Sequence, residues 1–150
     1  MKIKTLVASS LIAASTLFGG TYAVDPAHSS ADFSVKHMMI STVKGNFATF
    51  FGSFEYDEAN KQLKALKGEI AAASIDTGIK DRDDHLRSAD LFDVAKYPTI
   101  TFVLDEVKGD KAYGKLTLHG VTKPVVLAYD NGGVVKDPWG KQRVGVGLSG

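Results

Sequence analysis

The sequence predicts an all-β domain with one short helical excursion, and three observations support this fold class. Apolar and polar residues alternate along most of the chain, as they do in strands that bury one face. Gly, Asp and Asn residues interrupt the alternation at short intervals, which favours antiparallel neighbours. One polar stretch, 81–97, repeats its apolar residues with helical spacing instead. We therefore expect a meander that closes into a barrel or folds into a sandwich.

Seven segments carry the strand pattern. The segment 31–37 alternates regularly, while 43–56 moves its bulky residues from odd to even positions, which predicts a β-bulge within 49–52. The segment 63–75 contains three consecutive alanines, and small side chains such as Ala72 predict a gap beside it. The other four segments are 99–105, 112–118, 125–129 and 143–148, with a loop over 131–140 between the last two.

The stretch 81–97 predicts a short helix with Asp81 as its N-cap, followed by a second turn that Asp90 could cap and that ends before Pro98. Asp83 and Arg87 have i,i+4 spacing, so we expect them to pair. Together with His85, the carboxylates could bind a metal or supply a general base. The chain has no G-x-S-x-G, H-E-x-x-H or phosphate-loop motif, so a structural role is favoured. We predict no enzyme activity, no catalytic residue, no metal and no cofactor.

The N-terminus indicates export. Lys2 and Lys4 precede an apolar run over 6–18 that is too short to span a bilayer, and the small residues of 21–23 fit a signal-peptidase site. We expect residues 1–23 to be a signal peptide and residues 24–150 to form one domain. No other stretch is apolar and long enough to cross a membrane.

Composition excludes several kinds of partner and site. Removing Lys2 and Lys4 changes the formal charge from +1 to −1, so no basic excess remains to hold nucleic acid. The chain has no cysteine, which excludes disulfides, a thiol nucleophile and a cysteine-ligated zinc. An exported domain of this kind must be stabilised by its hydrophobic core.

Four motifs in order resemble the YceI-like, polyisoprenoid-binding family. They are FSVKHMMISTVKGNF (33–47), RDDHLRSADLFDVAKYPTITF (82–102), GKLTLHGVTKPVVL (114–127) and DPWGKQRVGVG (137–147). The resemblance implies a lipocalin-like antiparallel β-barrel with an elongated apolar lumen. It also implies a periplasmic location and a polyprenyl or other long-chain lipid as ligand. Family members continue past the position that matches Gly150, so by this resemblance we expect a barrel truncated at its C-terminal strands with one open edge, unless another part of the protein caps that edge.

The candidate ligand-binding residues lie on the apolar faces of the predicted strands. Apolar faces of this size would hold hydrocarbon if a dry gap remained between them, and would form an ordinary core if their own side chains filled it. The candidates are Phe33, Val35, His37, Phe47, Phe50, Phe54, Ile70, Ile100, Phe102, Leu104, Leu116, Leu118, Leu127, Val144 and Val146.

Two polar or amphipathic residues have alternative roles. His37 could touch a ligand headgroup, or it could hydrogen-bond to backbone at a strand end. Trp139 could stack on cargo or touch a membrane, although we expect it to pack over the end of the barrel.

We expect a periplasmic binding protein that sequesters or transports a polyisoprenoid or other long-chain lipid, with a quinone-type tail as one candidate. The alternatives are a hydrolase or metal-dependent enzyme that uses residues 81–87, and a stress-related structural protein with a filled barrel. Transient membrane contact and a dimer are both compatible with this interpretation.

Overall fold

The computed structural model describes the backbone of residues 12–18, 20–37 and 41–150, and the side chains of this part except those of 12–18 and His37. Within it, eight strands form a closed antiparallel barrel in the order β1-β11-β10-β9-β8-β6-β5-β2. The predicted all-β barrel is confirmed. Its strands are β1 (Ile12–Phe18), β2 (Thr21–Val24), β5 (Phe50–Asp57), β6 (Gln62–Ala71), β8 (Thr99–Lys108), β9 (Lys111–Leu118), β10 (Val121–Lys136) and β11 (Gln142–Ser149).

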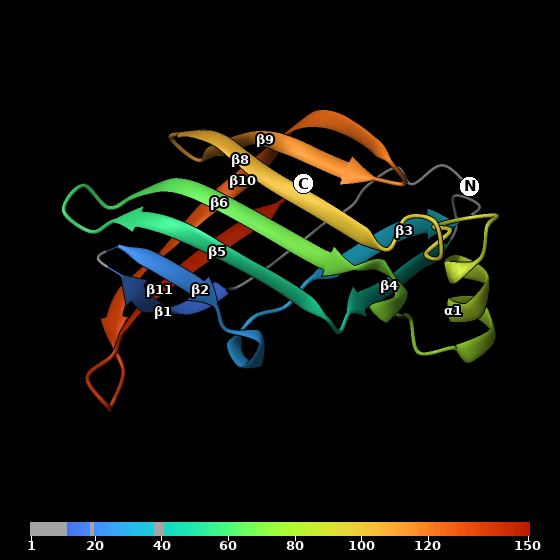
Figure 1. Ribbon diagram of the computed structural model, residues 1–150, viewed down its shortest axis with the longest axis horizontal. Helices are drawn as coiled ribbons and strands as arrows, with labels where there is room; N and C mark the ends of the chain where they lie inside the picture. The colour runs from blue at the N-terminus through green and yellow to red at the C-terminus, as the bar shows by residue number, and fades with distance from the viewer. Residues whose placement is uncertain (1–11, 19, 38–40) are drawn as a thin grey trace.

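A small second layer covers one end of the barrel. Figure 1 shows β3 and β4 beside α1 at the right-hand end, with the barrel strands running lengthwise to their left. This layer consists of the three-stranded sheet β3-β4-β7 and the helix. Along the chain, β3 and β4 connect β2 to β5, and β7 and α1 connect β6 to β8. The elements are η1 (Pro26–His28), β3 (Asp32–His37), β4 (Ser41–Phe47), η2 (Ala72–Ser74), β7 (Ile75–Asp76) and α1 (Lys80–Arg87).

The side-chain alternation that predicted the strands also sets which face is buried. In β5, Phe54 and Tyr56 are buried and Phe51 is exposed, and the register pairs Phe54 with Leu66 of β6. Cross-strand partners share a face, so the apolar positions of neighbouring strands meet inside the barrel. Tyr22 of β2 stacks on Phe54 with ring centroids 5.3 Å apart.

The predicted bulge within 49–52 is wrong, because the segment 43–56 is two strands in two sheets. β4 ends at Phe47 in the small sheet, and β5 begins at Phe50 in the barrel. A hydrogen bond of 3.1 Å from Ala48 N to Ser74 O lies at this break. The change of sheet accounts for the shift of bulky residues from odd to even positions.

The segment 63–75 also divides. β6 ends at Ala71, and the next three residues form the 3-10 helix η2 before β7. Ala72 is almost fully buried in packed surroundings, so it leaves no gap. The alanines allow a tight turn toward the small sheet, which the alternating pattern alone did not indicate.

Strand β10 is much longer than the predicted 125–129. It pairs with β9 through Val121 to Ala128 and with β11 through Ala128 to Lys136, with a register shift between Asn131 and Gly133. Glycines in 131–140 predicted a loop, but they continue the strand, and only the end of that segment forms the turn before β11. Glycine within strands often marks such irregularities.

The helix α1 begins one residue before the predicted cap. Ile79 is the N-cap residue and provides no side-chain cap, so the predicted cap at Asp81 is wrong. Asp83 instead accepts hydrogen bonds from the backbone N–H (2.9 Å) and the hydroxyl (2.5 Å) of Thr77. Arg87 pairs with Asp84 at 3.1 Å, so the predicted Asp83–Arg87 pair is also wrong. No described helix is both apolar and long enough to cross a bilayer.

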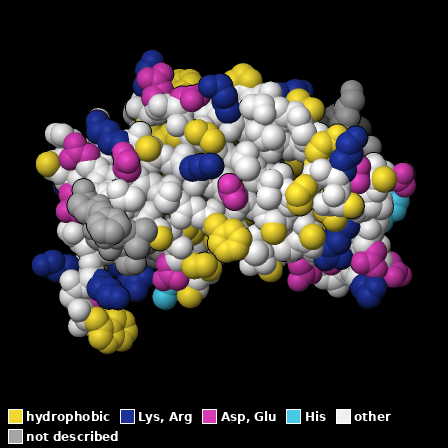
Figure 2. All heavy atoms as spheres, in the orientation of Figure 1, with side chains coloured by type: hydrophobic (Ala, Val, Ile, Leu, Met, Phe, Trp, Pro, Cys, Tyr) yellow, Lys and Arg dark blue, Asp and Glu magenta, His cyan; other side chains and the backbone are white. Residues whose placement is uncertain are grey.

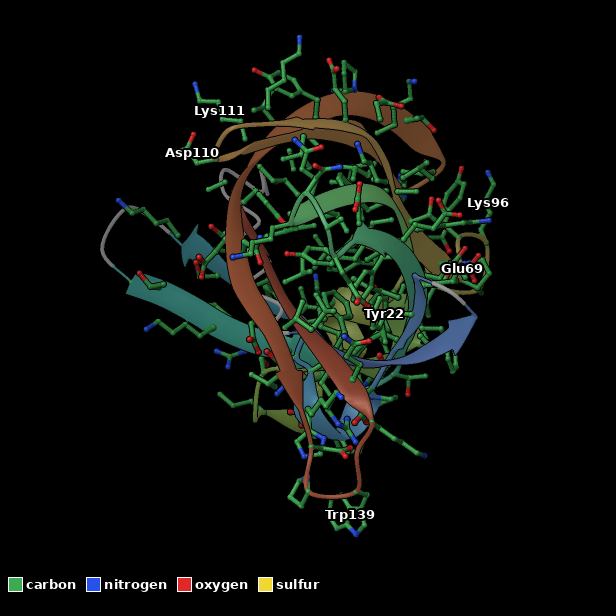
Figure 3. The ribbon with its side chains drawn as sticks, turned by 90° about the vertical axis from the view of Figure 1, so that its left-hand side faces the viewer. Tyr22, Glu69, Lys96, Asp110, Lys111 and Trp139 are labelled. Carbon is green, nitrogen blue, oxygen red and sulfur yellow. The ribbon has the colours of Figure 1, made fainter. Side chains whose placement is uncertain are left out.

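Two strands come from the segment that the sequence assigned to a signal peptide. β1 pairs with both β11 and β2, so the edge of β11 that was expected to be open has a partner here. The boundary at residue 24 falls inside β2, and Tyr22 in that strand is fully buried. Tyr22 also donates a hydrogen bond to Glu58. Figure 3 shows Tyr22 inside the ring of strands.

The buried apolar residues form two clusters. We call the first, inside the barrel, the barrel cluster; it comprises Tyr22, Phe54, Tyr56, Leu63, Leu66, Leu104, Ala112, Val144, Val146 and Leu148. We call the second, between the barrel end, the small sheet and α1, the end cluster; it comprises Ala31, Phe33, Val35, Phe47, Ala72, Ile75, Leu86, Phe92 and Ile100.

Candidate functional site: an apolar cavity in the barrel

A cavity of about 430 Å³ lies between the two clusters. This volume is within the range of about 300–1,000 Å³ that small-molecule sites occupy. Leu66 and Leu148 of the barrel cluster and Ala31 and Ile100 of the end cluster all border it. The apolar lining is completed by Val24, Phe50, Phe51, Ile70, Phe102, Leu116, Val125, Val126 and Leu127, with Gly68 and Gly150. Four polar residues, Ser30, Lys67, Glu69 and Thr101, also border the cavity.

Six of the candidate ligand-binding residues line this cavity: Phe50, Ile70, Ile100, Phe102, Leu116 and Leu127. They are inward residues from β5, β6, β8, β9 and β10, and strand pairing brings them together. Alternation predicted this part of the site, because it identifies the inner face of each strand.

Eight other candidates lie away from the cavity. Their side chains fill the two ends of the molecule, as the inner faces of a small barrel can do without a ligand. Phe54, Leu104, Val144 and Val146 belong to the barrel cluster, Phe33, Val35 and Phe47 belong to the end cluster, and Leu118 packs against the end cluster. The side chain of the remaining candidate, His37, lies outside the described residues.

Gly68 is the lining residue that best explains why a space remains. It faces Phe102 across the β6–β8 pair and follows the inward alternation of Leu66 and Ile70. A Cβ at Gly68 would meet no atom closer than 4.0 Å. The missing side chain therefore leaves room in the barrel wall at Gly68, and not beside Ala72 as the sequence predicts.

One edge of β10 borders the cavity without a strand partner. Residues 121–127 pair with β9, and within the described chain no strand pairs with their other edge. Val125, Val126 and Leu127 of this edge line the cavity. The edge also carries Lys123 and Pro124, residues that protect exposed edges from pairing with another chain. Lys123 lies opposite the cavity residue Leu116.

Tyrosine hydroxyls lie at the end of the barrel away from α1. The hydroxyl of Tyr56 lies 2.9 Å from the side-chain nitrogen of Asn131, which also donates a 3.1 Å hydrogen bond to the carbonyl of Lys61. Burial, with a smaller contribution from nearby Tyr56, raises the pKa of Tyr129 to about 12. The hydrogen bonds of Asn131 with Tyr56 and Lys61 join the long β10–β11 hairpin to the β5–β6 turn, so this end is closed by polar contacts.

The polar side chains of residues 81–87 attach α1 to its neighbours, and they are not arranged as a catalytic site. Arg87 donates to the carbonyls of Ala73 at 2.8 Å and Ile75 at 2.9 Å, and His85 is exposed. Lys80 pairs with Asp84, and these contacts lower the pKa of that carboxyl. Across the described residues, no group of three or more His, Asp or Glu side chains is placed to hold a metal ion.

Trp139 is 81% exposed, so the expectation that it packs over the barrel end is wrong. Figure 3 shows it at the tip of the β10–β11 hairpin, pointing away from the strands. It does not line the cavity. The turn that carries it is held by its own hydrogen bonds, which keep the ring in solvent.

Comparison with known proteins agrees with this architecture. Residues 22–147 match the YceI-like domain. A UPF0312 protein of Vibrio vulnificus (strain YJ016) is 42% identical over 131 residues, which cover 83% of this chain and 69% of that protein. A YCEI protein of Campylobacter jejuni has a crystal structure with a TM-score of 0.71 and 38% identity, over 85% of this chain and 77% of that chain.

A more distant structure shares the fold alone. It is a polyisoprenoid binding domain from Saccharophagus degradans, with a TM-score of 0.50 and 14% identity over 95% of this chain and 97% of that chain. The domain match covers most of the sequence. It starts in β2, at the buried residue Tyr22. With these relatives and this barrel, the chain belongs to the YceI-like domain family.

Proposed function

We propose that the protein binds the hydrocarbon chain of a polyisoprenoid or other long-chain lipid in the apolar cavity of its barrel. The observation that carries this proposal is the cavity of about 430 Å³, lined mostly by apolar side chains from two packed clusters. The fold likeness to a polyisoprenoid binding domain supports the same ligand class. An apolar cavity from which water is excluded accepts hydrocarbon.

The energetics suit a carrier. Each methylene removed from water contributes about 0.8 kcal/mol, so a long chain needs no polar contact for strong binding. A lipid that leaves a bilayer gains little from exchanging one apolar environment for another, so uptake and release are nearly balanced.

We further propose that the protein works in the periplasm and carries its lipid through transient contact with a membrane. Lys2, Lys4 and the apolar run 6–18 support export. A binding role is favoured over the enzyme alternative because Asp83 and Arg87 are occupied in structural hydrogen bonds. It is favoured over the filled-barrel alternative by the cavity itself.

A variant that fills the cavity tests the proposal. Gly68→Val adds a side chain on the cavity side at a position where the Cβ would meet no atom closer than 4.0 Å, and valine has a higher strand propensity. Its matched control is Gly147→Val on the outer face of β11, where a Cβ would make an ordinary contact of 3.4 Å with Asp130. Neither substitution falls at a glycine with positive φ.

The readout is thermal unfolding with a prenyl alcohol, geranylgeraniol, in detergent-matched buffer. At a ligand concentration of about 100 Kd, binding should stabilise the native state by about 2.7 kcal/mol and raise Tm by roughly 5–10 °C. We expect this shift for the wild type and for Gly147→Val, and a much smaller one for Gly68→Val. No shift in any of the three proteins would reject lipid binding and favour the filled barrel.

A further inference from the structure

The tip of the β10–β11 hairpin exposes an unusual amount of apolar surface. Trp139 is 81% exposed and Val135 is 64% exposed. Figure 1 shows this hairpin projecting beyond the lower left of the barrel, and Figure 2 shows an apolar side chain at that extremity with Lys and Arg side chains close to it. The tip is convex, so Trp139 is presented outward and lines no groove.

The turn is built to hold this position. Asp137 N–H donates to the carbonyl of Lys141 at 2.8 Å, and Gly140 N–H donates to the carbonyl of Asp137 at 3.0 Å. The carboxylate of Asp137 accepts the N–H groups of Trp139 and Lys141, both at 2.9 Å. Gly140 has a φ of +80°, which favours glycine. The exposed tryptophan thus belongs to a closed, hydrogen-bonded turn.

Two ion pairs of Arg143 hold the turn against the barrel. Arg143 of β11 donates through Nε to Asp137 at 3.2 Å and through Nη1 to Asp25 at 2.8 Å. Burial of Asp137 opposes its ionisation, but hydrogen bonds from Lys141 N–H and Arg143 outweigh burial and lower the pKa of its carboxyl. Arg143 thus pairs with both carboxylates, Asp25 and Asp137, and its single positive charge offsets one of their two negative charges.

The charge that remains at the tip is positive. Lys136 and Lys141 flank Trp139 in sequence, and neither ammonium forms an ion pair with another described residue. Tryptophan prefers the interface between water and lipid, where its ring is buried and its N–H stays hydrated. Lysines beside it are attracted to anionic headgroups.

We propose that Trp139, Lys136 and Lys141 form a docking tip that inserts into the surface of a bilayer containing anionic lipid. The proposal names the residues of the membrane contact in the proposed function and rests on that contact, but it needs no lipid in the cavity. A convex apolar tip with flanking cations suits penetration between lipid headgroups. The cavity lies elsewhere in the barrel, so the tip would anchor the protein and not guide the cargo.

The experiment uses the full chain, in which Trp139 is the only tryptophan. Its fluorescence therefore reports on the tip alone. We expect a blue shift and a rise in intensity with vesicles of phosphatidylcholine and phosphatidylglycerol (7:3), and quenching when the acyl chains are brominated. Vesicles of phosphatidylcholine alone should give a weaker response, and added salt should weaken binding to the mixed vesicles.

Variants separate the tip from the rest of the surface. Trp139→Ala and Lys136→Gln/Lys141→Gln should each reduce cosedimentation with the mixed vesicles at least fivefold. The matched controls are Ile79→Ser, which removes another exposed apolar residue, and Lys108→Gln/Lys111→Gln at the β8–β9 turn. Both controls should bind vesicles as the wild type does. Among the described residues, Lys108 pairs with Glu106 and lies over the Tyr113 ring, whereas Lys111, Lys136 and Lys141 form no ion pair. Folding should therefore be preserved in all four variants, which circular dichroism can check.

An unshifted emission maximum with every vesicle, or equal cosedimentation of Trp139→Ala and wild type, would overturn the docking tip. Binding of the tip to a protein without vesicle binding would also overturn it. The ligand shift of Trp139→Ala in the thermal assay separates the two proposals. If the shift is retained while vesicle binding is lost, both stand; if the shift is absent in wild type while vesicles are bound, lipid carriage alone fails.

Discussion

Gly114 of β9 lies directly beneath the ring of Phe102, which borders the cavity. A Cβ at Gly114 would lie 2.5 Å from the carbonyl oxygen of Val103 and 2.6 Å from Cζ of Phe102. Gly114→Ala should therefore lower the free energy of unfolding by about 1–3 kcal/mol and push the Phe102 ring toward the cavity. Urea unfolding measures the loss, and an unchanged midpoint would show that β8 and β9 can accommodate the added methyl group.

Phe102→Trp, in contrast, should extend into the cavity, lower lipid occupancy and leave stability nearly unchanged.

Tyr129 predicts a loss of stability at high pH. Its pKa is raised to about 12 from an ordinary value of 10, so the folded state holds the phenolic proton more tightly than the unfolded state. The stabilisation is complete below pH 10 and is lost as the pH rises from 10 toward 12. Tyr129→Phe should show a flatter dependence of the unfolding free energy over this window. Parallel curves for the two proteins would assign the loss to other groups.

Single residues show where sequence reasoning succeeds and where it stops. Alternation identified Phe102 and Ile70 as inward residues, because the period of a strand fixes which face a side chain takes. It could not separate cavity from core, since Phe54 has the same pattern as Phe50 but stacks on Tyr22. Gly68 lies on the predicted inner face, and a glycine among large apolar residues was the one available signal for a space.

At the scale of the element, α1 depends on one arginine. Arg87 donates to the carbonyls of both η2 and β7, and hydrogen bonds from a charged donor are worth about 1.5–3 kcal/mol each before solvent screening. Because its side chain is 33% exposed, we expect Arg87→Met to cost about 2 kcal/mol in total. His85→Ala should leave stability and ligand binding unchanged. If His85→Ala lost ligand binding while keeping its stability, the enzyme alternative would be favoured instead.

Strand β2 gives a second prediction at this scale. A protein that begins at Val24 lacks Tyr22, which is fully buried against Phe54, whereas one that begins at Gly20 keeps it. Loss of a buried aromatic side chain typically costs about 3–5 kcal/mol. The free energy of unfolding of the shorter protein, measured by urea denaturation, should be lower by this amount. Equal midpoints would show that β2 contributes little once β1 has been removed from both.

The elements that sequence predicted least well are those whose local pattern is overridden by the topology. The shift of parity after Phe47 resembled a bulge, yet it marks the passage of the chain from one sheet to another. Glycines near Gly133 resembled a loop, yet pairing with β11 continues β10 through them. Both errors involve contacts between residues far apart in sequence, which a local window does not contain.

At the scale of the whole molecule, two clusters divide the interior, and the cavity lies between them. The barrel cluster is closed by tyrosine contacts at one end, and the end cluster is covered by the small sheet and α1 at the other. The fold class and the helix were predictable from periodicity and from the resemblance to a known family. The division into two clusters was not, because it depends on how the layers meet.

The most direct test of the account is solvent extraction and mass spectrometry of the small molecules that copurify with the wild type, Gly68→Val and Gly147→Val. We predict about one isoprenoid or other long-chain lipid per wild-type or Gly147→Val molecule, and a strongly reduced amount in Gly68→Val, with all three proteins folded. Folded proteins that carry no lipid, or equal amounts of lipid in all three, would contradict the assignment of the cavity as the lipid site.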